Sequence, residues 1–83
     1  MSMKFYAIAY KYQEDVFYNF EKEDTTLDSI SPAMLLPTEQ MAEEYIEDQL
    51  SDDFVAVDVT IVSYRNGITQ YEIGKVEQWD EVF

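Results

Sequence analysis

A long stretch of alternating side chains in the C-terminal half constrains the fold of this chain most strongly. Residues 54–64 place a β-branched apolar side chain at every second position: Val55, Val57, Val59 and Ile61. A two-residue period is typical of a β-strand with one face buried. Asn66 and Gly67 follow as a strong turn signal, and residues 68–76 are predicted to return as a second strand. The sequence therefore predicts an antiparallel hairpin over residues 54–76.

Two registers of this hairpin are compatible with the turn. A two-residue connection places Ile61 opposite Glu72, whereas a three-residue connection over residues 65–67, with Gly67 left-handed in a bulge, places Ile61 opposite Tyr71. The second register pairs apolar side chains with apolar ones, so we favour it.

The N-terminal part predicts a second hairpin. Residues 3–12 alternate in a two-residue period with apolar or aromatic side chains on both faces, and residues 16–20 form a second β-rich run. Residues 21–37 contain Pro32 and Pro37 and show no regular period, so we expect a loop there. Its apolar side chains are expected to attach this loop to the core.

One helix is predicted between the two hairpins. Thr38 has the character of an N-cap, and the helix is expected from Glu39 to about Leu50. At 100° per residue one apolar stripe is expected on it, formed by Met41, Ala42, Tyr45, Ile46 and Leu50. The chain thus predicts a single α+β domain over residues 1–83. We expect an antiparallel sheet of about four strands (β-hairpin, helix, β-hairpin) with one helix packed on one face.

The negative charge of the chain is concentrated in its middle. Eighteen acidic residues against five basic ones give a net charge of −13, yet no basic residue occurs between Lys22 and Arg65. Seven acidic residues in this interval fall on the predicted helix and the turn after it: Glu39, Glu43, Glu44, Glu47, Asp48, Asp52 and Asp53. Like charges at i,i+4 destabilise a helix, so this pattern indicates either a surface for a positively charged partner or a face that only confers solubility.

Several functions are disfavoured by the residues that the chain lacks. It has no histidine and no cysteine, so no catalytic centre, cofactor or metal site is expected. The carboxylates of residues 47–53 do not have the spacing of a calcium-binding EF-hand loop. A net charge of −13 opposes direct binding to nucleic acid or to an anionic membrane. Without an apolar span or a secretory signal, the expected location is the cytoplasm.

The tyrosines suggest a second way to associate. A sheet with one helix leaves its other face open, and four tyrosines are candidates to line it: Tyr10, Tyr12, Tyr18 and Tyr64. Tyrosine is enriched at protein interfaces, so a homodimer through this face is an alternative, with the chain acting as a small accessory or structural module.

In size, acidity and lack of catalytic residues the chain is similar to small phage-encoded DNA mimics and anti-defence proteins, such as anti-restriction and anti-CRISPR inhibitors. This resemblance is one of general character. It implies a non-catalytic inhibitor whose partner is the basic groove of a nucleic-acid-binding protein.

Overall fold

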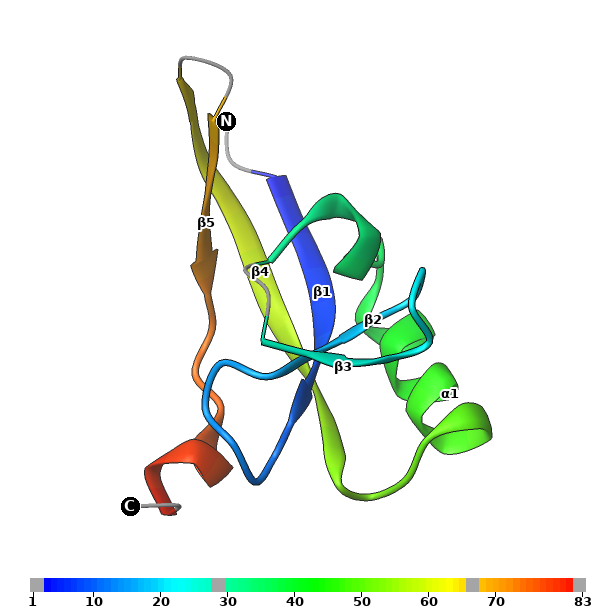
Figure 1. Cartoon of the computed structure of the whole chain (residues 1–83). Coiled ribbons are helices and arrows are strands. Elements are labelled where there is room, and N and C mark those ends of the chain that lie inside the picture. The colour runs from blue at the N-terminus through cyan, green and yellow to red at the C-terminus, as the bar shows by residue number, and fades with distance from the viewer. Residues whose placement is uncertain (1–2, 28–29, 66–67, 82–83) are drawn as a thin grey trace.

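Five strands form one antiparallel sheet in the order β3-β2-β1-β4-β5 in the computed structural model of the protein (Figure 1). The strands are β1 (Met3–Tyr10), β2 (Phe17–Asn19), β3 (Asp24–Thr26), β4 (Phe54–Arg65) and β5 (Ile68–Ile73). The structure describes residues 3–27, 30–65 and 68–81, and only the backbone of residues 63–65, 68, 80 and 81. The α+β fold with an antiparallel sheet is confirmed, with one strand more than expected.

The centre of the sheet joins the two predicted hairpins. β1 pairs antiparallel with β4 over eight positions, from Met3 opposite Ile61 to Tyr10 opposite Phe54. Because side chains alternate along a strand, this register gives the sheet two apolar faces. Ala7 and Val57 lie on one of them.

The pairing of β4 with β5 follows the favoured register where the two strands lie beside the core. Ile61 lies opposite Tyr71, and Val59 lies opposite Ile73. Apolar side chains therefore face one another across the two strands, as predicted.

The bulge of this hairpin lies at a different position from the one expected. Nearer the turn Arg65 lies opposite Ile68, which is the register of a two-residue connection, and the register changes at Val62. The prediction of a three-residue connection with a bulge at Gly67 is therefore wrong, although Gly67 itself lies outside the described residues. β1 begins at Met3 opposite Ile61, so a bulge at Val62 lies beyond the pairing of β1 with β4 and leaves it undisturbed.

β3 lies within the segment for which only a loop was expected. The buried Asn19 holds the turn that leads to it, because its Oδ1 accepts hydrogen bonds from the backbone N–H groups of Glu21 (2.9 Å) and Lys22 (3.1 Å). Glu23 then takes a left-handed conformation with φ 52°. A side-chain-stabilised turn thus brings three polar residues back against β2.

The helix agrees with its predicted limits. α1 runs Glu39–Gln49, and the Thr38 hydroxyl accepts a hydrogen bond from the backbone N–H of Met41 at 3.2 Å, as expected of an N-cap. Ala42 is fully buried against the sheet. The assignment of Met41 to the apolar stripe is wrong, since this side chain is 45% exposed. Within the described residues no helix is long and apolar enough to cross a membrane.

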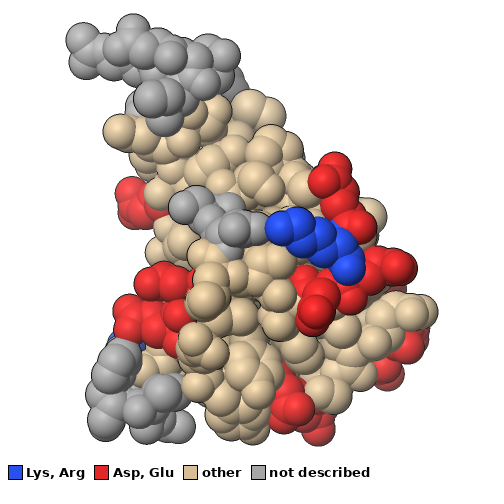
Figure 2. Space-filling model, viewed as in Figure 1, with Lys and Arg blue, Asp and Glu red and all other residues tan. Residues whose placement is uncertain are grey.

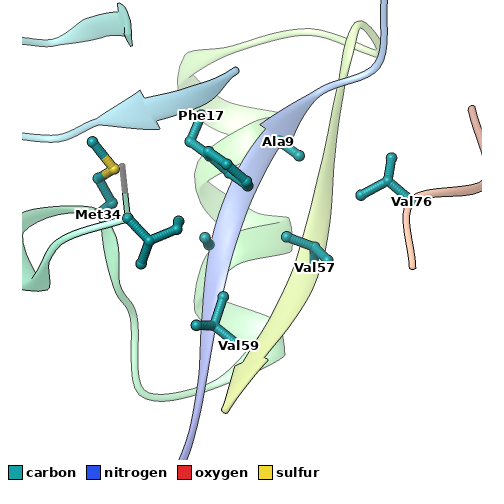
Figure 3. Close-up of a cluster of buried hydrophobic side chains, with 8 residues drawn as sticks. Ala9, Phe17, Met34, Val57, Val59 and Val76 are labelled. Atoms are coloured by element: carbon teal, nitrogen blue, oxygen red, sulfur yellow. The ribbon is translucent and has the colours of Figure 1, made fainter. Parts of the chain in front are cut away.

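Both faces of the sheet are covered, which corrects the expectation of an open face. α1 covers one face, where Ile8, Tyr18 and Ala42 are buried together. The other face is covered by two short 3₁₀ segments, η1 (Pro32–Met34) and η2 (Glu77–Glu81), and by the residues beside them. Buried side chains on this second face include Ala9, Phe17, Met34, Val57, Val59 and Val76 (Figure 3).

The C-terminal segment is held on this second face by Trp79. Its Nε1–H donates a 2.7 Å hydrogen bond to the carbonyl oxygen of Tyr10, and its ring lies 5.7 Å from that of Phe17 in an edge-to-face arrangement. The indole therefore closes the sheet face with both a polar and an aromatic contact.

Candidate functional site

The seven acidic residues predicted as partner contacts are all exposed, on α1 and the turn that follows it. We call them the acidic helix surface: Glu39, Glu43, Glu44, Glu47, Asp48, Asp52 and Asp53. Figure 2 shows acidic side chains on the side of the molecule where α1 lies, with basic atoms among them. The seven residues are thus all accessible to a partner on one continuous segment, α1 and the turn after it.

The helix that carries the acidic helix surface packs firmly against the sheet. Partly buried side chains of α1, including Tyr45 and Ile46, pack against the cluster around Ile8. Beyond the helix, the Ser51 hydroxyl donates to Asp53 Oδ2 (3.2 Å) and accepts from the backbone N–H of Asp53 (3.3 Å). These two hydrogen bonds order the turn into β4 without the glycine that often ends a helix.

A groove of about 450 Å³ lies between α1 and the turn that joins β2 to β3. Glu23 lines it from that turn, and Glu44 and Asp48 line it from α1, together with the exposed Met41. Glu23 therefore extends the acidic helix surface onto a second element. No group of three acidic side chains among the described residues is placed to hold a metal ion.

One acidic residue between Lys22 and Arg65 lies away from the acidic helix surface. Asp58 on β4 forms an ion pair with Lys4 on β1, with Nζ 3.9 Å from Oδ2. It also lies against Gly74, where an added Cβ would overlap its carboxylate. Figure 2 shows further acidic side chains on the edge of the molecule away from α1, so the negative charge as a whole is not confined to one ridge.

The four tyrosines expected on an open face do not form one. Tyr18 is 7% exposed and lies on the α1 side, with its ring 5.5 Å from that of Tyr45. The Tyr10 ring packs on Phe54 at 5.4 Å. Tyr12 is exposed, and the side chain of Tyr64 lies outside the described residues. The placement on an open face is therefore wrong, because the face opposite α1 is covered and Tyr18 belongs to the other one.

Among the described residues, the buried Tyr18 has a pKa that its surroundings clearly shift. Its hydroxyl shares a 3.2 Å hydrogen bond with that of Tyr45. This hydrogen bond, burial, and the negative charges of Glu23 and Asp24 raise the pKa of Tyr18 from 10.0 to about 12.

An absorbance titration of tyrosine ionisation should therefore show a group with a pKa of about 12 that disappears in Tyr18→Phe. Because the folded-state pKa is raised, the stabilisation from neutral Tyr18 is fully present below pH 10.0 and is lost as the pH rises towards 12. Tyr12→Phe, at an exposed position, is the matched control. The assignment fails if both variants change the titration in the same way.

Comparison of the chain with known protein families, with characterised proteins and with solved structures gives no match.

Proposed function

We propose that this protein is a non-catalytic interaction module whose acidic helix surface occupies the basic groove of a nucleic-acid-binding protein, as a DNA-mimic inhibitor would. The observation that carries the proposal is the exposure of seven carboxylates on α1 and the turn after it, in a segment without lysine or arginine.

The spacing of these carboxylates suits a groove that holds a nucleic-acid backbone. Residues at i and i+4 on a helix have Cβ atoms about 5–6 Å apart, so Glu39, Glu43 and Glu47 present a row of regularly spaced negative charges. A basic groove that neutralises phosphates with lysine and arginine side chains can pair with such a row of carboxylates in the same way. Glu23 adds a charge beside the helix and widens the acidic footprint.

The helix is poorly optimised for its own stability, which favours a binding role. The like-charge pairs at i,i+4 each cost about 0.2–0.5 kcal/mol. No basic residue occupies the last turn of α1, where a positive charge would interact favourably with the helix dipole. A face that served solubility alone would not require the exclusion of lysine from the whole helix.

The test is to immobilise the protein and pass a cell lysate over it at low salt. Nucleic-acid-binding proteins are expected to be enriched and to be released by excess duplex DNA. Release is also expected at about 1 M salt, where the Debye length is about 3 Å. Captured proteins that duplex DNA does not displace, or that stay bound at high salt, would contradict the proposal. The absence of any captured nucleic-acid-binding protein would also contradict it and would support a solubilising role.

A further inference from the structure

A second cavity lies on the sheet face opposite α1, away from the acidic helix surface. Its volume is about 470 Å³, within the range of roughly 300–1,000 Å³ typical of small-molecule sites. The residues that line it come from the loop between β1 and β2, from β2, from the segment after β3 and from β5: Asp15, Phe17, Leu27, Ile30, Thr69, Tyr71 and Ile73.

Most of this lining is apolar and fixed by the core. Phe17 is 2% exposed and Ile30 is 9% exposed, and both belong to the buried cluster of this face. Tyr71 and Ile73 pack against the same cluster from β5. Leu27, which is 75% exposed, adds an apolar side chain that the fold itself leaves in solvent. The cavity can therefore take the apolar body of a ligand without a change in the core.

The polar groups that line the cavity favour a positively charged ligand. Asp15 supplies a carboxylate, Thr69 and Tyr71 supply hydroxyls, and the described residues that line the cavity include no lysine or arginine. Asp15 is exposed at a left-handed position with φ 62°, and its carboxylate makes no hydrogen bond or ion pair within the described part of the chain. The net charge of −13 adds a field that attracts cations and repels anions.

We infer that this cavity binds a small organic cation with an apolar body, such as an arylalkylamine, which is protonated at neutral pH. The ring lies on the apolar lining and the ammonium group faces the Asp15 carboxylate. This activity is independent of the proposed function, because the cavity shares no residue with the acidic helix surface.

Three probes of similar shape test the inference: 2-phenylethylamine, 2-phenylethanol and 3-phenylpropionate. In a ¹H–¹⁵N NMR titration, the amine should shift the backbone amide signals of Thr69 and Ile73. It should bind about two- to fivefold more tightly than the alcohol, the effect of one solvent-exposed ion pair, and the carboxylate should bind most weakly. No shift at these amides, or equal affinity for the three probes, would overturn the inference.

Two variants with the same change in charge separate a local effect from that of the overall field. Asp15→Asn should remove most of the preference for the amine over the alcohol while leaving the alcohol affinity unchanged, since asparagine tolerates a left-handed backbone. The neighbouring Glu14→Gln, which does not line the cavity, should keep the preference. Equal effects of the two variants would overturn the role of Asp15. Thr69→Trp should fill the cavity and weaken all three probes.

Discussion

Replacing Glu43, Glu44, Glu47 and Asp48 by lysine is expected to abolish the capture of nucleic-acid-binding proteins while the fold remains. Each substitution adds two charges, so the net charge changes from −13 to −5. If each reversal costs about 0.7 kcal/mol of binding free energy, the four together cost about 3 kcal/mol, roughly a hundredfold in affinity. All four side chains are exposed, and lysines near the end of α1 interact favourably with its dipole.

A matched variant tests whether binding depends on the position of the reversed charges or only on the net charge of the protein. Glu14, Glu21, Glu72 and Glu77 are exposed and lie outside the acidic helix surface, and their replacement by lysine also gives a net charge of −5. This variant should keep most of the binding. Equal loss in the two variants, or unchanged binding in the first with an unaltered circular dichroism spectrum, would refute the assignment of the contact surface to α1.

Truncation of Met34 to alanine is expected to destabilise the protein by about 2–5 kcal/mol, the effect of a cavity in a packed core. Met34 is 1% exposed in η1 and covers the sheet face opposite α1. Domains of this size have a free energy of unfolding near the lower end of about 5–15 kcal/mol, so the loss is a large part of the total. Urea unfolding measures it through a shift of the midpoint.

Met41→Ala is the matched control, because it is the same substitution at a position that is 45% exposed. It should change the free energy of unfolding by less than about 1 kcal/mol. If Met34→Ala were no more destabilising than Met41→Ala, η1 would not form part of the core, and its part of the sheet face opposite α1 would not be covered.

Local patterns were sufficient to predict the elements whose side chains repeat regularly. The alternation of residues 54–64 marked β4, and the acidic and apolar sides of residues 39–50 marked α1 together with its Thr38 cap. β3 was missed because it contains only three polar residues, and its place is fixed by the side chain of Asn19 rather than by a hydrophobic period. No local sequence pattern predicts a turn that is held by one buried side chain in this way.

The covering of the second sheet face could not be predicted for a related reason. Trp79 donates to the carbonyl oxygen of Tyr10 across 69 residues of chain, and Met34 lies in a proline-containing segment without periodicity. Such contacts depend on tertiary structure alone. The exposure of the seven acidic residues was predictable because ionised carboxylates avoid the interior. The face on which Tyr18 lies was not predictable, because the alternation of side chains does not show on which face of the sheet the helix packs.

The central position of β1 has a consequence for the order in which the chain can fold. β1 is made before β4, yet its eight pairings with that strand need the segment from Phe54 to Ile61. On the ribosome β1 and β4 therefore cannot pair until most of this domain has emerged. Until then the apolar side chains of β1 stay exposed in the incomplete nascent chain. The carboxylates of the intervening segment give nascent chains a mutual repulsion during this interval, which limits their aggregation before β4 arrives.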